Sequence, residues 1–130
     1  MIKKRTLNEL AFIVILTFLI QSCSKSDYKV KVKYTNATGS KIEGLKIGDH
    51  RIGKLGIDEE TKNIPYQEFR FDSGLPDEPI VGKIDGEKTL DYSTFYNCGT
   101  QKYAVSEGSF EIEIKKVEID DKTYLLLNLK

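Results

Sequence analysis

Tryptophan is absent from this chain of 130 residues, histidine and methionine each occur once, and cysteine occurs only twice. Structural zinc sites usually take several histidine or cysteine ligands, so His50 alone does not predict one. A serine–histidine–acid triad would need the same histidine, and no Gly-x-Ser-x-Gly turn is present to expose a nucleophile. Glycine-rich phosphate-binding motifs are also missing. We therefore predict that the chain is not an enzyme, with no catalytic residue, cofactor or metal.

The charges show no excess of either sign, with 20 basic and 20 acidic residues. A nucleic-acid partner requires a basic field that displaces counterions from phosphates, so none is expected. Paired carboxylates could in principle cleave glycosides. Acids are spread along the whole chain, however, and we expect most of them to form a solvated surface.

Long apolar runs are also lacking. The longest, residues 10–20, has 11 residues and is interrupted by Thr17, whereas a membrane-spanning helix takes about 20. Lys3, Lys4 and Arg5 precede the run, and the small residue Ser22 follows it. A charged start, a short apolar run and a small residue before a break predict a secretory signal.

The stretch Leu19-Ile20-Gln21-Ser22-Cys23 resembles the lipobox of bacterial lipoproteins. This resemblance implies diacylation of the Cys23 sulfur, cleavage before Cys23 and attachment to a membrane through lipid. Ser24 and the polar tether are similar to those of Bacteroidota lipoproteins, which implies the outer membrane and leaves its periplasmic or surface face open. The expected organisation is a signal peptide, a lipidated tether and one domain, at residues 1–22, 23–27 and 28–130.

Cleavage before Cys23 would leave a chain of 108 residues with 17 basic and 19 acidic side chains. A chain of this size commonly folds as one domain. If the Cys23 sulfur carries lipid, Cys98 has no disulfide partner. Free cysteine is among the most buried residue types, so we expect Cys98 to be a small buried side chain. The only histidine, His50, is expected to be solvent-exposed beside a turn.

Strand patterns fill the rest of the sequence, and no helical periodicity exceeds one turn. From Tyr28 to Asn36, apolar residues alternate with lysine and threonine, which indicates a strand with one buried face. Gly48-Asp49, Asp85-Gly86 and Asp120-Asp121 are typical of hairpin turns. We predict an all-β fold, specifically an immunoglobulin-like sandwich of about seven to nine short antiparallel strands, with a small β-barrel as the alternative.

Three changes in the alternation predict bulges or bends. They fall at Glu43-Gly44, at Lys115-Lys116 and within the strand expected over residues 63–71. The three successive leucines at residues 125–127 suggest a strand covered on both faces. The segment Asp72–Pro79, with two prolines, a glycine and three acids, is predicted to be an exposed loop.

Several tyrosines surround the Cys98-Gly99 turn and exceed what one face of one strand can bury. The expected strand over residues 87–97 would make Phe95 the core residue and leave the tyrosines partly exposed. Tyrosine suits recognition because it offers a large rigid area and a hydroxyl. The predicted contact surface for an envelope protein or a glycan consists of Tyr92, Tyr96, Tyr103, Asp72, Asp77 and Glu78.

The sequence therefore favours a lipid-anchored envelope protein that acts as a non-catalytic binding or assembly module. A small-ligand carrier with a cavity inside a β-barrel is an alternative. An immunity-type inhibitor that neutralises a secreted toxin is a further alternative within the binding class.

Overall fold

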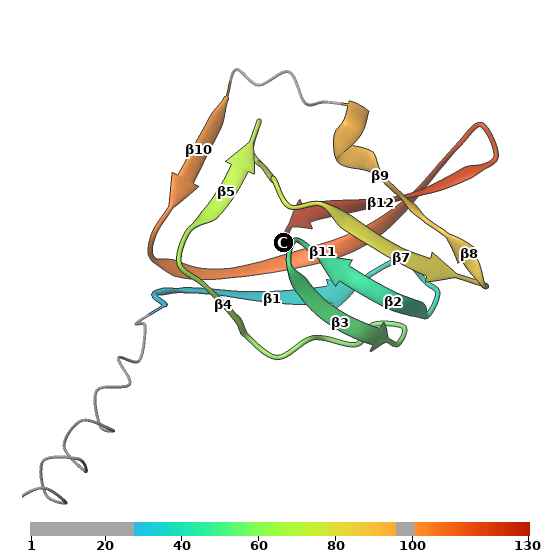
Figure 1. The fold of residues 1–130 in the computed structure, drawn as a ribbon, viewed down its shortest axis with the longest axis horizontal. Helices are drawn as coiled ribbons and strands as arrows, with labels where there is room; N and C mark the ends of the chain where they lie inside the picture. Colours follow the sequence, from blue (N-terminus) through green and yellow to red (C-terminus); the bar gives the residue numbers. More distant parts are fainter. Residues whose placement is uncertain (1–27, 96–100) are drawn as a thin grey trace, which may run out of the picture.

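The structure, a computed structural model, describes residues 28–95 and 101–130. The expected signal peptide, Cys23, the tether, Tyr96 and Cys98 lie outside the described residues. Within the described ranges the chain forms twelve strands and one short 3-10 helix, η1 (Tyr92–Phe95), so the all-β prediction is confirmed (Figure 1). The arrangement is consistent with both a sandwich and a small barrel. It contains more strands than the seven to nine expected, because four of them are only two or three residues long.

The strands form three sheets. The five-stranded sheet has the order β4 (Ile64–Tyr66), β1 (Val30–Asn36), β11 (Gly108–Ile119), β12 (Lys122–Leu129) and β9 (Leu90–Asp91). The four-stranded sheet has the order β3 (His50–Leu55), β2 (Ile42–Ile47), β7 (Ile80–Ile84) and β8 (Glu87–Lys88). The three-stranded sheet has the order β10 (Lys102–Val105), β5 (Phe69–Asp72) and β6 (Leu75–Pro76). Most pairings are antiparallel, but β1 runs parallel to β11 and β12 runs parallel to β9.

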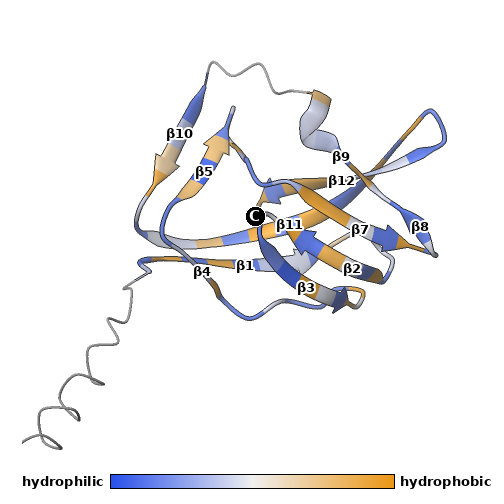
Figure 2. Cartoon of the chain, viewed as in Figure 1, coloured by the Kyte–Doolittle hydropathy of each residue, from blue (hydrophilic) through white to orange (hydrophobic). Residues whose placement is uncertain are grey.

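One hydrophobic core joins the three sheets. The predicted alternation along β1 is confirmed, since Val30, Val32 and Tyr34 are fully buried while the lysines between them face outward. The same cluster includes Ile42 and Leu45 from the four-stranded sheet and Phe69 and Phe71 from the three-stranded one. Figure 2 shows the resulting mixture of apolar and polar residues along most strands.

Two of the expected hairpins close through the tightest kind of turn. At Asp85-Gly86 the φ angles are 53° and 79°, and at Asp120-Asp121 they are 51° and 61°. Two successive residues with positive φ give a two-residue turn whose twist matches that of the flanking strands. Aspartate tolerates this left-handed region better than most side chains, which suits Asp120 and Asp121 to the turn.

The predicted bulge at Glu43-Gly44 is confirmed. The register of β2 shifts there against both β3 and β7, and Gly44 has a φ of 56°. The predicted break within residues 63–71 is also present as a change of sheet, because Tyr66 ends β4 and Phe69 begins β5 in another sheet.

The predicted bulge at Lys115-Lys116 is wrong, because β11 pairs with β12 without any shift from Ile112 to Ile119. Val117 keeps strict alternation and lies opposite Tyr124 on the other face of the hairpin. That face is covered by η1, since the rings of Phe95 and Tyr124 lie 5.0 Å apart. The change of apolar phase along β11 therefore reflects a change in which face of the β11–β12 hairpin is covered.

The burial of the leucines of β12 shows that both faces of this strand are at least partly covered. Leu125 and Leu127 are buried, and Leu126 on the opposite face is half-buried. Among residues 28–95 and 101–130, no helix is long and apolar enough to cross a membrane.

Candidate functional site

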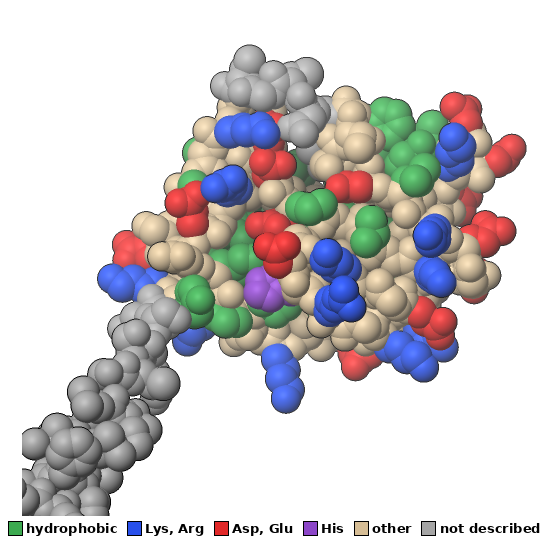
Figure 3. Space-filling model, in the orientation of Figure 1, with side chains coloured by type: hydrophobic (Ala, Val, Ile, Leu, Met, Phe, Trp, Pro, Cys, Tyr) green, Lys and Arg blue, Asp and Glu red, His purple; other side chains and the backbone are tan. Residues whose placement is uncertain are grey.

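A polar groove of about 790 Å³ opens where three segments meet. The segments are the β2–β3 hairpin, the connection between β4 and β5, and the chain between β6 and β7. A volume of this size lies within the usual range for ligand sites. Figure 3 shows this face of the molecule, with the single histidine (purple) beside acidic side chains (red). The side chains that define the groove are Asp49, His50, Tyr66, Arg70, Asp77 and Glu78.

The Glu78 carboxylate packs directly over the β2–β3 turn. A methyl group added to Gly48 would overlap Glu78 Oε2, and the Gly48 N–H donates to the Pro79 carbonyl at 2.7 Å. Partial burial raises the pKa of the Glu78 carboxyl, and the nearby charges of Asp77 and Asp49 raise it further. A cation that enters this end of the groove would therefore stabilise the charged form of Glu78.

A buried tyrosine pair forms the wall beneath Glu78. The Tyr34 and Tyr66 hydroxyl oxygens lie 2.7 Å apart, and the ring of His50 meets that of Tyr66 edge-to-face with centroids 4.8 Å apart. His50 is therefore half-buried, where solvent exposure was expected. Burial raises the pKa of Tyr66 to about 12, and burial together with Tyr66 raises the pKa of Tyr34 above its usual value of 10.

These two pKa shifts predict a loss of stability in alkali. Between the unfolded pKa of about 10 and the folded pKa of Tyr66 of about 12, the unfolded chain releases phenolic protons that the folded chain retains. The free energy of unfolding should be insensitive to these groups below about pH 10 and fall as the pH rises above it, by up to about 1.4 kcal/mol per pH unit for each tyrosine. Urea unfolding across this range measures the slope.

Tyr34→Phe should make that alkaline slope shallower, because one of the two retained protons is gone. Tyr28→Phe, which alters an exposed tyrosine, serves as the matched control and should leave the slope unchanged. An equal slope in the wild type and in Tyr34→Phe would show that the buried pair does not control alkaline unfolding.

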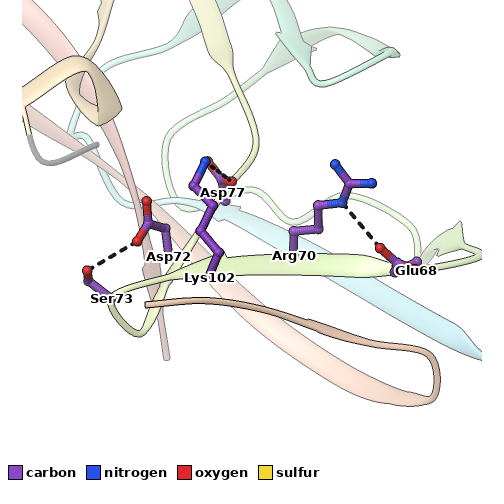
Figure 4. Close-up of polar contacts among 6 residues, drawn as sticks. All are labelled: Glu68, Arg70, Asp72, Ser73, Asp77 and Lys102. Carbon is purple, nitrogen blue, oxygen red and sulfur yellow. Dashed lines mark hydrogen bonds and ion pairs between the residues drawn. The ribbon is translucent and has the colours of Figure 1, made fainter. Parts of the chain in front are cut away.

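A second, smaller hollow of about 350 Å³ adjoins the groove and shares Glu68, Arg70 and Asp77 with it. It adds Lys102 and Tyr103 from β10. The charges pair across it (Figure 4): Lys102 Nζ lies 3.5 Å from Asp77 Oδ2, and Arg70 Nε donates to Glu68 Oε1 at 3.2 Å. The groove and the hollow together form one polar surface, which we call the binding groove.

Asp72 lies at the end of β5 beside this surface. Its residue exposure is only 2%; Oδ1 accepts a hydrogen bond from Ser73 Oγ at 3.2 Å, and Oδ2 has no hydrogen-bond partner. The prediction that residues 72–79 form an exposed loop is wrong here. Residues 75–76 pair with β5 as strand β6, and both Asp72 and Pro76 are buried.

Three residues of the predicted contact surface come together. Asp77 and Glu78 line the larger hollow, and Asp77 and Tyr103 line the smaller one. Tyr103 is 52% exposed and its ring stacks on that of Phe71, with centroids 5.2 Å apart. Asp72 lies next to this group but is covered.

Tyr92 belongs to a different part of the molecule. It lies in η1, where its ring contacts Phe95 at 5.4 Å and Tyr124 at 6.4 Å, and Figure 1 shows η1 near β12 and away from β10. Phe95, expected in the core, is 55% exposed. The expected strand over residues 87–97 gives way to a 3-10 helix, in which residues three apart share one face, so Tyr92 and Phe95 lie together.

The sequence did not single out Asp49, Tyr66 and Arg70 as site residues. Asp49 was visible only as part of a turn, and Tyr66 and Arg70 only as alternating strand residues. Their proximity depends on contacts between the β2–β3 hairpin and the chain after β6, which no local pattern encodes.

No family model, curated protein or solved structure matches this chain. In the part of the chain that the structure describes, no group of three or more histidine, cysteine, aspartate or glutamate side chains is arranged to hold a metal ion.

Proposed function

We propose that this chain is a lipid-anchored protein of the bacterial envelope whose β domain is a non-catalytic binding or assembly module, with the binding groove as its contact surface. The observation that carries this proposal is the meeting of Asp77, Glu78 and Tyr103, predicted as contact residues from the sequence, around two adjoining hollows. Tyr103 projects from the paired strand β10, and the Asp77 N–H donates to the Arg70 carbonyl of β5 at 2.9 Å, so the backbone of both residues is held in place.

The position of the groove supports a link with the anchor. Tyr66 is the Cα partner of Val30, the first residue of β1. The groove therefore lies at the end of the domain where the chain arrives from the proposed tether, and a partner in the groove would be held close to the membrane.

The packing supports a binding module over a ligand carrier. Among the residues that the structure describes, twelve large side chains from the three sheets are less than 2% exposed and belong to one core cluster. A carrier would need inward side chains that leave a cavity. The binding groove lies outside this core, at the edges of the sheets.

Mass spectrometry of membrane-extracted protein tests the anchor. The protein should lack residues 1–22 and carry lipid on Cys23. A Cys23→Ser variant should leave the membrane fraction, and the proposed anchor is wrong if this variant stays membrane-bound and fully processed.

A pull-down from envelope extracts tests the contact surface. The triple variant Asp77→Asn, Glu78→Gln and Tyr103→Ser should lose a partner that the wild type retains, with an unchanged thermal melt. The matched control makes the two charge changes at exposed sites of the β11–β12 hairpin, as Asp121→Asn and Glu118→Gln, and should retain the partner. An identical partner set for both variants would remove the groove from the proposal.

A further inference from the structure

The binding groove carries more negative than positive charge. Its acidic side chains are those of Asp49, Glu68, Asp77 and Glu78, and its lysine and arginine side chains are those of Arg70 and Lys102. An aromatic residue accompanies them, because Tyr66 lines the larger hollow, whereas the Tyr103 ring stacks on Phe71 on the other side of the sheet from Arg70 and Lys102. Carboxylates together with aromatic faces are the chemistry that binds ammonium and guanidinium groups.

Asp72 provides an independent observation that points to a cationic group. Its Oδ2 is buried without a hydrogen-bond partner. Burial removes water from this carboxylate oxygen, and no hydrogen bond replaces that water, which costs free energy. Asp72 and Arg70 share one side of β5 by strand alternation, and Lys102 is the Cα partner of Asp72 on β10. Figure 4 shows the Asp72 side chain on the same side of these strands as Asp77, Lys102 and Arg70.

Lys102 holds Asp77 only loosely. Their contact of 3.5 Å exceeds the usual length of a charge-assisted hydrogen bond, and the Lys102 side chain is 48% exposed. The Asp77 side chain is the more covered partner, at 23% exposure. A lysine ammonium on its flexible four-carbon stem can exchange one acceptor for another at little cost, and Asp72 offers the alternative acceptor on the same sheet face.

We propose that the binding groove recognises the lysine or arginine side chains of a basic segment in a protein partner. When this segment binds, Lys102 breaks its contact with Asp77 and moves to Asp72. The inference rests on the proposed binding function and names the chemistry of its partner. When a cationic group enters, it bonds to Asp77 and Glu78 beside Tyr66. Lys102 then supplies the partner that Asp72 Oδ2 lacks, so the exchange offsets the loss of the Lys102–Asp77 contact.

Fluorescence anisotropy with a labelled hexalysine peptide tests this proposal, using the full chain extracted in a non-ionic detergent. The wild type should bind hexalysine, more weakly as salt rises, and should not bind hexaglutamate. Asp77→Asn should weaken hexalysine binding about tenfold, the effect of losing one charge-assisted contact. Asp121→Asn makes the same change in net charge on the distant β11–β12 turn and should leave the affinity unchanged.

A double-mutant cycle separates the Lys102 exchange from simple charge attraction. Asp72→Asn should weaken hexalysine binding about threefold, because Lys102 loses its second acceptor. Lys102→Met should strengthen binding, because Asp77 becomes free. In the Lys102→Met background, Asp72→Asn should have no effect. An equal effect of Asp72→Asn in both backgrounds overturns the exchange, and a thermal melt at least as high as that of the wild type verifies that Asp72→Asn folds.

The two proposals can fail separately. If the wild type does not bind hexalysine but the groove variant still loses its partner in the pull-down, the basic partner is excluded and the binding function stands. If hexalysine does not bind and the groove variant keeps every partner, both proposals fall.

Discussion

Replacing Phe69 with alanine should lower the free energy of unfolding by about 3 to 5 kcal/mol, the usual range for removing a fully buried phenylalanine. Phe69 is 0% exposed on β5, and its ring lies 5.0 Å from that of Tyr66 on β4 and 6.1 Å from that of Phe110 on β11. It therefore joins the three-stranded sheet to the five-stranded one. Its loss leaves a cavity between the two sheets that the surrounding rings can only partly fill.

Urea unfolding followed by tyrosine fluorescence measures this effect, since the chain has no tryptophan. Phe95→Ala is the matched control: the ring is 55% exposed, and its removal should cost about 1 kcal/mol or less. The three-stranded sheet carries Arg70 and Lys102, and Asp77 directly follows its strand β6, so Phe69→Ala should also weaken partner binding under conditions where the chain is still folded. A loss of stability no larger than that of Phe95→Ala would show that other contacts hold this sheet.

Replacing Asn36 with alanine should be nearly as severe and should destabilise the domain by about 3 kcal/mol or more. The buried Asn36 amide donates to the carbonyls of Ser40, Leu55 and Gly56 at 2.8, 3.0 and 2.9 Å. Its Oδ1 accepts from both the N–H and the Oγ1 of Thr38, at 3.1 and 2.7 Å. One side chain thus connects the end of β1, the turn before β2 and the end of β3.

The same unfolding measurement, with two further variants, tests the origin of this effect. Asn36→Asp keeps the shape but removes the amide donors and places a negative charge against carbonyl oxygens, so it should destabilise at least as much as Asn36→Ala. Asn128→Ala removes an exposed amide that donates only to the neighbouring Leu129 carbonyl, and it should change stability by about 0.5 kcal/mol or less. Similar losses of stability for Asn36→Ala and Asn128→Ala would show that the hydrogen bonds of Asn36 do not stabilise the domain.

Local features of the fold could be predicted because each depends on a few neighbouring residues. Alternation fixes the buried face of β1, the Asp85-Gly86 pair fixes a hairpin, and Gly44 supplies the positive φ that the bulge in β2 uses. The change of apolar phase near Val117 was wrongly interpreted as a bulge because its cause is not local. A local pattern shows which residues are apolar, but it does not show that η1 covers the second face of the β11–β12 hairpin.

The candidate site was only partly predictable. Asp77, Glu78 and Tyr103 carry signals of their own, as acids in a proline-rich segment and as an aromatic in a strand. Asp49 and His50 enter the groove because the β2–β3 hairpin packs against the chain after β6, with Gly48 leaving room for Glu78. That contact joins segments distant in sequence and depends on the complete fold.

The parallel pairing of β1 with β11 affects when the main sheet can form during synthesis. Val30 pairs with Gly108 and Asn36 with Ile114, so a central strand of the main sheet pairs with a strand that is synthesised much later. Domains dominated by such distant pairings fold slowly, because loop closure precedes the contacts that reward it. The growing chain therefore has no complete central sheet until β11 emerges. If the chain is exported as proposed, this delay leaves its central sheet unformed during the early part of synthesis.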